Sequence, residues 1–318
     1  MKIKAVPKGA AFFCIDFMVN FVLPVKLWIM VQETGNRLYL AIQKQTERIE
    51  YFCTVENISP NLIIHELRKS FKRLRALLLF YVETSNEEIQ NSNAEIRIFG
   101  KLLAPLRESF VNAELFEREI LANTLVSEKK TREAKDRLFA KNKELVDRGF
   151  FENNLQQVIR SFFDKSNFQL ILKKAPFPSK ILIMKQISSS YLKGYSIFEQ
   201  LEAYEDAEKL HELRRKLKQL WYQIDFVKFL HPRYFKLKSD QLNKITEQQG
   251  DDHDLFIFAE ELKSGEYGFD PEELEILENQ IQHLREINLL KLEPRLKQFF
   301  KESPQEFNIK LEEIFKVV

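Results

Sequence analysis

The sequence predicts an all-α protein: two similar four-helix-type bundles, related by an internal duplication with pseudo-two-fold symmetry, and long accessory helices. Apolar residues make up 44% of the 318 residues, while only 8 Gly and 10 Pro are available for turns. From about Thr34 onward, apolar residues recur at the spacing of amphipathic helices, and no stretch sustains the alternation of a strand. A basic helix led by histidine also occurs twice, which indicates the duplication.

The first 33 residues are apolar, and several interpretations of them stay open. Three lysines precede the stretch AAFFCIDFMVNFVLPVKLWIMV, as in a signal peptide or an anchor. Polar residues and a proline interrupt this stretch, whereas a bilayer requires about 20 uninterrupted apolar residues. A clear cleavage site is missing. An extra helix on the core, or a true start at Met30, would also account for it.

Residues 34–172 form the expected first helical half. Its segments carry single apolar stripes and begin at Ser, Asn or Pro, as helix N-termini do. We expect its helices within residues 36–52, 59–83, 85–121 (two helices joined near Pro105) and 127–163. The alternating charges of residues 128–148 are typical of a solvated helix face.

The segment KKAPFPSK, residues 173–180, contains two prolines and is the best linker in the chain. Residues 173–318 form the expected second helical half, with helices within residues 195–230, within residues 239–265 and after Asp270. Two cysteines, Cys14 and Cys53, are too few for a disulfide framework and favour a reducing compartment. A cytoplasmic protein is therefore expected, unless residues 1–30 direct export or anchoring.

The two halves align at an offset of 146 residues without a gap. This offset places LAPLRESFV (103–111) on QGDDHDLFI (249–257). It also pairs the two His-led helices: His65 with His211, Leu67 with Leu213, Arg68 with Arg214, Lys69 with Arg215 and Lys72 with Lys218. One register that aligns two separate motifs favours an internal duplication.

Each His-led helix has one basic face and one leucine-rich face, because residues advance by about 100° along a helix. His65, Arg68, Lys69 and Lys72 share a face, and Leu67 and its neighbours lie opposite. We expect no acid within these basic rows, so an external anion would complete them. Phosphate oxygens suit paired Arg donors, Lys charges and a protonated His. The alternative is a solvated basic face without a ligand.

The motif H-x-L-R-[KR]-x-x-[KR]-x-L, present in HELRKSFKRL and HELRRKLKQL, resembles the CHAD family, the conserved histidine α-helical domain. LAPLRESFV and GDDHDLFI resemble the L-G-x-x-R-D-x-x-V element that follows each basic helix in that family. The resemblance covers about residues 34–318. It implies two bundles whose basic faces line a central groove, and non-catalytic binding of inorganic polyphosphate without a cofactor. Polyphosphate granules or polyphosphate-metabolising enzymes are candidate partners.

The resemblance assigns phosphate contacts to matching positions only. These positions are His65, Arg68, Lys69, Lys72, Arg73, Arg75, Arg107, His211, Arg214, Arg215 and Lys218, and Tyr222 shares the second basic face. Lys185, Tyr191 and Lys193 are further groove candidates without a motif.

Four positions depart from the family pattern. Trp221 and Gln219 occupy positions where the family has basic residues, and Ala104 and Glu108 replace Gly and Asp. We therefore expect the second half to bind the polyanion less strongly, or Trp221 to fill the edge of the groove.

Other function classes are less well supported. Residues 251–254 gather three Asp and one His, but consecutive residues do not share a helix face, so we expect helix capping rather than metal binding. The sequence lacks a P-loop, and we expect no acid row facing the basic helices. We therefore predict no catalysis, with a metal-dependent phosphohydrolase as a weaker alternative. A generic nucleic-acid or polyanion binder is the main alternative. However, the net charge is only +2, and only Tyr222 and Trp221 offer aromatic stacking on the basic faces.

Overall fold

The computed structural model describes residues 34–84, 86–121, 125–165, 168–201 and 206–317. Within these ranges the chain forms helices and no strand, so the predicted all-α class is confirmed. No helix in this part of the chain is both long and apolar enough to cross a membrane. The expectations for residues 1–33 lie outside the described residues.

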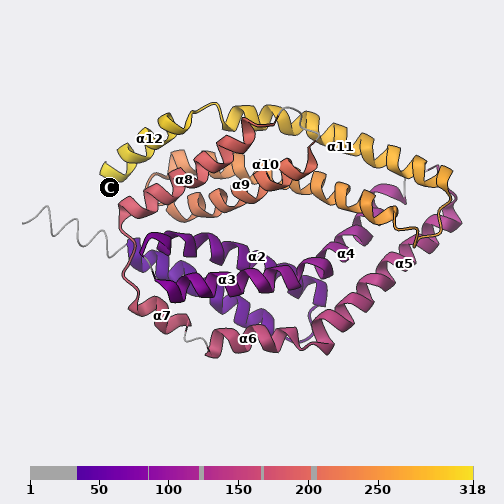
Figure 1. Cartoon of the computed structure of the whole chain (residues 1–318), viewed down its shortest axis with the longest axis horizontal. Helices are drawn as coiled ribbons and strands as arrows, with labels where there is room; N and C mark the ends of the chain where they lie inside the picture. Colours follow the sequence, from indigo (N-terminus) through magenta and orange to yellow (C-terminus); the bar gives the residue numbers. More distant parts are fainter. Residues whose placement is uncertain (1–33, 85, 122–124, 166–167, 202–205, 318) are drawn as a thin grey trace, which may run out of the picture.

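The first half begins with a helix over residues 34–54 and continues with short turns between helices (Figure 1). Its further elements are α2 (Pro60–Leu78), η1 (Leu79–Thr84), α3 (Glu87–Leu102), α4 (Ala104–Leu115), η2 (Phe116–Ile120), α5 (Glu128–Val146), η3 (Asp147–Glu152), α6 (Leu155–Lys165) and α7 (Phe168–Lys174).

The second half contains fewer and longer helices. They are α8 (Lys180–Phe198), α9 (Ala207–Val227), α10 (Pro232–Leu262), α11 (Pro271–Phe299) and α12 (Pro304–Val317). Residues 175–179, within the expected linker, are not helical and connect α7 to α8. Their interpretation as the boundary between two halves stays a prediction.

Local sequence signals explain where the longest helices begin. The Asp206 carboxylate accepts the backbone N–H of Lys209 at 3.0 Å and caps α9. Asp270 and Glu273 form a reciprocal capping box at the start of α11. Proline occupies the first turn of α2, α4, α10 and α11, where its missing N–H costs no helical hydrogen bond.

The segments that the offset of 146 aligns differ in structure around residue 104. In the first half the helix is interrupted at Leu103, next to Pro105, as predicted. In the second half α10 runs through Gly250 and residues 251–254 without a break. The capping role expected for residues 251–254 is therefore wrong. A glycine inside a helix costs only about 1 kcal/mol, which packing on both sides can offset.

Two apolar clusters hold the helices together. The larger one joins buried residues of both halves and lies where α2 and α9 pack against each other. A second cluster joins α4, α5, α10 and α11 at the opposite end, where Figure 1 shows these helices converging. The faces of α2 and α9 that are turned away from the apolar clusters are left to polar and charged side chains.

The helix bounds recur at the offset of 146. Shifted by 146, α2 spans 206–224, and α9 covers 207–227; shifted α5 spans 274–292, inside α11. Because α4 contacts both α2 and α10, while α10 also contacts α9, the four segments that carry the sequence motifs adjoin one another.

Candidate anion-binding site

The basic faces of α2 and α9 are held in place by the leucine stripes behind them. Leu67 and Leu74 of α2 and Leu213 and Leu217 of α9 are fully buried. This burial agrees with the apolar stripes expected from the sequence. Since these stripes fix the rotation of both helices, their basic residues are directed into the space that adjoins α4 and α10.

Five basic side chains from three helices influence one another there, and we call them the cation cluster. The cluster consists of Arg68 and Lys72 of α2, Arg107 of α4, and Arg214 and Lys218 of α9. Burial is the largest cause that lowers the pKa of each of them. Arg107 and Arg214 lower the pKa of Arg68 further by repulsion.

Lys72 occupies the middle of the cation cluster. Burial, followed by repulsion from Arg214, Arg68 and Lys218, lowers its pKa to about 7. Its side chain is nevertheless exposed to solvent. The two properties are compatible: many protein atoms surround the ammonium group, while part of the residue is accessible to solvent. Lys72 therefore lies in a crowded, open position that a ligand can reach.

The surroundings of Lys218 also disfavour its charged form. Burial and repulsion from Arg214 lower its pKa to about 8. Its Nζ donates a hydrogen bond to Thr246 Oγ1 at 3.1 Å and lies 4.2 Å from the centre of the Trp221 ring. Its described contacts are thus neutral groups.

The cluster cations form no ion pair with the residues that the structure describes. None of the five lies within 4.0 Å of a carboxylate among the described residues. Two other cations with restricted exposure are paired: Lys141 contacts Glu261 at 2.7 Å and Glu266 at 2.8 Å, and Lys238 contacts Glu302 at 2.7 Å. Unpaired charge at this density is costly and marks the cluster as a candidate functional site.

Acids do face the cluster at longer range, which corrects one expectation. The carboxylates of Asp254 and Glu108 favour the charged form of Arg68, and Asp254 acts in the same way on Arg214 and Lys72. Burial raises the pKa of Asp254 itself. The sequence-based expectation that no acid faces the basic helices is therefore wrong, although these acids do not form close pairs with the cluster.

Gly250 makes room for Arg214. A Cβ atom added at Gly250 would lie 2.8 Å from Arg214 Nη2, so the guanidinium group lies directly on the backbone of α10. The Nε of Arg214 is buried and has no hydrogen-bond partner in the described part of the chain. In the first half Ala104 occupies the equivalent position, and Arg68 instead donates to the Gly100 carbonyl oxygen at 2.7 Å.

The two leading histidines border the cluster. Burial and repulsion from Arg107 lower the pKa of His65. Burial and repulsion from Arg214 lower the pKa of His211 to about 4, so His211 is neutral at pH 7. The His211 ring lies 4.0 Å from the ring of His253, measured between centroids.

Of the remaining predicted contacts, Arg73 faces α9, whereas Arg75 and Lys69 contact polar or acidic neighbours and Arg215 is exposed. Arg73 reaches across to α9, where its guanidinium carbon lies 5.6 Å from the centre of the Tyr222 ring. Arg75 instead donates to Asn93 Oδ1 of α3 at 3.1 Å, away from α9. Lys69 pairs with Glu66 at 3.5 Å, and Arg215 is exposed beside His211.

The candidates that lacked a motif lie elsewhere. Tyr191 is buried in the core, stacked on Phe307 at 4.0 Å, and does not contribute to the cluster. Lys185 and Lys193 are exposed on α8. Gln219 donates to Ser190 Oγ of α8 at 2.9 Å, so this departure from the family pattern faces away from the cluster.

Trp221 stays at the border of the cluster. Its Nε1 donates to Ser239 Oγ of α10 at 3.0 Å, and one ring face meets the Lys218 ammonium group.

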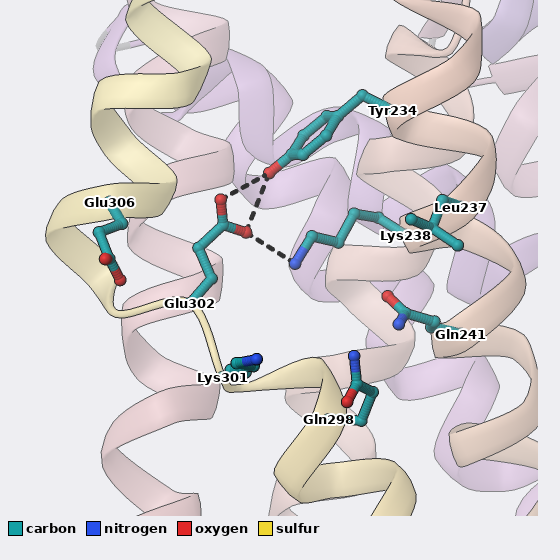
Figure 2. A pocket seen from close by; sticks show the side chains of 8 residues that line it. All are labelled: Tyr234, Leu237, Lys238, Gln241, Gln298, Lys301, Glu302 and Glu306. Carbon is teal, nitrogen blue, oxygen red and sulfur yellow. Dashed lines mark hydrogen bonds and ion pairs between the residues drawn. The ribbon is translucent and has the colours of Figure 1, made fainter.

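A separate pocket lies between α10 and the turn that joins α11 to α12 (Figure 2). Glu302 accepts hydrogen bonds from Tyr234 Oη at 3.1 and 3.3 Å and pairs with Lys238. No cluster residue lines this pocket. The paired charges of Lys238 and Glu302 distinguish it from the cation cluster, and they link α10 to the turn before α12.

Three residues of α10 were missed as site residues: Gly250, His253 and Asp254. The offset of 146 places His253 at the position of Arg107, and that alignment is the signal that could have found it. Asp252, the remaining buried acid of this segment, accepts hydrogen bonds from Arg285 of α11 at 3.1 and 3.4 Å. No group of three or more His, Cys, Asp or Glu side chains is arranged to hold a metal ion among the residues described.

A comparison with known protein families identifies a domain in this chain. The family model described as CHAD domain matches residues 41–263, more than half of the chain. This range includes α2, α4 and α9 entirely and all of α10. No curated protein matches the chain.

Proposed function

The chain belongs to the CHAD domain family, and from this premise we propose that it binds inorganic polyphosphate without catalysing a reaction on it. The chain of phosphates would lie in a basic groove formed by α2, α4, α9 and α10, with contacts from two duplicated halves. The cytoplasm is the proposed location, and polyphosphate granules or polyphosphate-metabolising enzymes are the proposed further partners.

The observation that carries this proposal is the cation cluster without ion pairs. Five basic side chains from α2, α4 and α9 repel one another, and no carboxylate of the described chain lies within 4.0 Å of them. The buried Arg214 Nε and His211 Nδ1 also have no partner there. A polyanion would supply both the missing charge and the missing acceptors.

A linear phosphate polymer fits better than a nucleic acid. The cations come from both His-led helices, so a repeating chain of charges can meet all of them in succession. Single-stranded nucleic acids usually require open aromatic surfaces. Here Arg73 lies over Tyr222, and Lys218 lies over one face of Trp221. A generic polyanion or nucleic-acid binder remains the alternative that the test must separate.

A binding role agrees with the surroundings of the cluster acids. Metal-dependent phosphoryl transfer uses carboxylates that hold divalent cations. Asp254 and Asp251 instead lie within electrostatic reach of Arg214, which lowers the pKa of both carboxyls against the effect of burial. These two carboxylates thus favour the charged form of Arg214.

The test is a titration with long-chain polyphosphate across a salt series, with duplex and single-stranded DNA as competitors. The variant Arg68→Ala/Lys72→Ala/Arg214→Ala/Lys218→Ala should lose at least a hundredfold in affinity, since each charge-assisted contact contributes about 1.5 kcal/mol or more. A matched control removes four exposed cations of α5 and η3: Lys129→Ala/Arg132→Ala/Lys143→Ala/Arg148→Ala.

The outcomes separate the alternatives. Binding that resists DNA and is lost only in the cluster variant supports the proposal. Equal affinity for DNA would make the protein a generic polyanion binder. Equal losses in both variants, or no binding by the wild type at 0.1 M salt, would refute a polyphosphate site at the cluster.

A further inference from the structure

Two histidines from different helices are in contact at the border of the cation cluster. The ring centroids of His211 on α9 and His253 on α10 are 4.0 Å apart, with an angle of 35° between the ring planes. The Nδ1 atom of His211 is buried and has no hydrogen-bond partner in the described part of the chain. When the neutral His211 ring takes up a proton, a nearby group must stabilise the resulting charge.

The charged groups around the pair belong to three helices. Lys72 of α2 and Arg214 of α9 act on both rings, and Arg215 of α9 acts on His211. Burial is the largest cause that lowers the pKa of His211 to about 4 and that of His253 to about 3; His211 then lowers the pKa of His253, and Arg214 and Lys72 lower both further. On α10, Asp251 and Asp254 act in the opposite sense on Arg214.

His253 occupies the position that Arg107 holds in the first half. The offset of 146 joins these two residues, and Arg107 belongs to the cation cluster through its effects on Arg68 and His65. The first half therefore presents a permanent positive charge at this position, whereas the second half presents a side chain whose charge depends on its surroundings.

We propose that His253 is a further phosphate-binding residue of this site, and that the His211–His253 pair gains a proton from solvent when polyphosphate binds. This inference rests on the proposed function. Phosphate oxygens beside the pair would offset the repulsion from Lys72 and Arg214 and would accept a hydrogen bond from the protonated ring. The second half would thus complete its positive charge only in the presence of the ligand.

The sign of the pH dependence follows from linkage. If binding returns the pair toward the ordinary histidine pKa of about 6.5, the bound state holds more protons than the free state between about pH 4 and pH 6.5. Affinity should therefore rise as the pH falls through this range. A return to that value corresponds to about tenfold tighter binding at pH 5.5 than at pH 7.5.

The experiment measures the affinity for long-chain polyphosphate at pH 5.5 and pH 7.5. The variants are His253→Gln, His253→Arg and the control His283→Gln, an exposed histidine of α11 outside the cluster. His65, Asp251 and Asp254 stay in every variant, so their share of the pH dependence is common to all. NMR of labelled histidines with and without polyphosphate follows the proton directly, and circular dichroism checks that each variant folds.

The inference predicts that His253→Gln loses most of the gain at pH 5.5, and that His253→Arg binds more tightly than wild type at pH 7.5 with a weaker pH dependence. The pKa of His253 should rise on binding, and His283→Gln should behave like wild type. The inference is overturned if His253→Gln keeps the wild-type ratio and the His253 resonance titrates identically with and without polyphosphate. No binding at either pH would instead refute the proposed function itself, and this inference with it.

Discussion

At the scale of single residues, a substitution at Gly250 should change the free energy of unfolding and the affinity for polyphosphate in opposite directions. The variant Gly250→Ala places a Cβ 2.8 Å from Arg214 Nη2, and the flexible guanidinium group must move away. Alanine is the better helix former, so the free energy of unfolding should rise by up to about 1 kcal/mol. Polyphosphate affinity should fall at the same time, because Arg214 is displaced. Urea unfolding and a binding titration measure the two effects.

Gly100→Ala is the matched control for this change. A Cβ at Gly100, also inside a helix, meets no atom within 4 Å. This variant should gain similar stability and keep its affinity. If Gly250→Ala binds polyphosphate like wild type, the position of Arg214 on α10 does not matter for the ligand.

Lys72 should react as an unusually nucleophilic lysine. With a pKa of about 7, about half of its amines are neutral at pH 7, whereas an ordinary lysine with a pKa of about 10.4 is almost fully protonated. A neutral acylating reagent at pH 7.5 should therefore modify the exposed Lys72 before Lys185 on α8. Polyphosphate should suppress this reaction, because a nearby anion raises the pKa of an amine. Peptide mass spectrometry measures both rates, and equal labelling of the two lysines would contradict the prediction.

The residue scale also shows where sequence reasoning reaches its limit. On a helical wheel Arg73 and Arg75 lie about 80° to either side of His65 and are equivalent in sequence. The neighbouring helices decide between them: α9 brings Tyr222 to Arg73, whereas α3 brings Asn93 to Arg75. Periodicity identifies the basic face, but the edges of that face depend on tertiary packing.

At the scale of elements, the two faces of α9 should respond differently to mutation. Leu217 is fully buried, so Leu217→Ala should lower the free energy of unfolding by about 3 kcal/mol. Lys218→Ala removes a repelled charge together with one hydrogen bond to Thr246, and these effects oppose each other. Its stability should stay within about 1 kcal/mol of wild type while polyphosphate affinity falls. Chemical denaturation and binding titrations of both variants test this division, and a large stability loss in Lys218→Ala would contradict it.

The contrast between α10 and the α3–α4 pair explains what could be predicted at this scale. Pro105 reliably indicated a break, because proline cannot donate the helical hydrogen bond. Residues 251–254 were expected to cap a helix start, yet α10 continues through them: Asp252 accepts hydrogen bonds from Arg285, and Arg214 packs against Gly250. These compensations come from α9 and α11, so α10 read alone could not reveal them.

At the scale of the whole molecule, the all-α class followed from helical periodicity, whereas the expectation that the two basic faces meet came from the resemblance to the CHAD family. What the offset could not supply is the difference between the halves. Ala104 against Gly250, and Arg107 against His253, change where Arg68 and Arg214 lie and which charges are permanent. These two differences act through contacts between helices, which helical periodicity does not report.

Polyphosphate should stabilise the molecule as one unit, because the cation cluster joins α2 to α9 and the main apolar cluster includes buried residues of both halves. At a ligand concentration one hundred times Kd, the free energy of unfolding should rise by about 2.7 kcal/mol, and thermal unfolding should shift upward as a single transition. At 1 M salt the Debye length is only about 3 Å, so most of this stabilisation should disappear. Differential scanning calorimetry at 0.1 and 1 M salt measures both effects. A shift that survives 1 M salt, or that persists in the four-fold cluster variant, would mean that the ligand acts through contacts other than these cations.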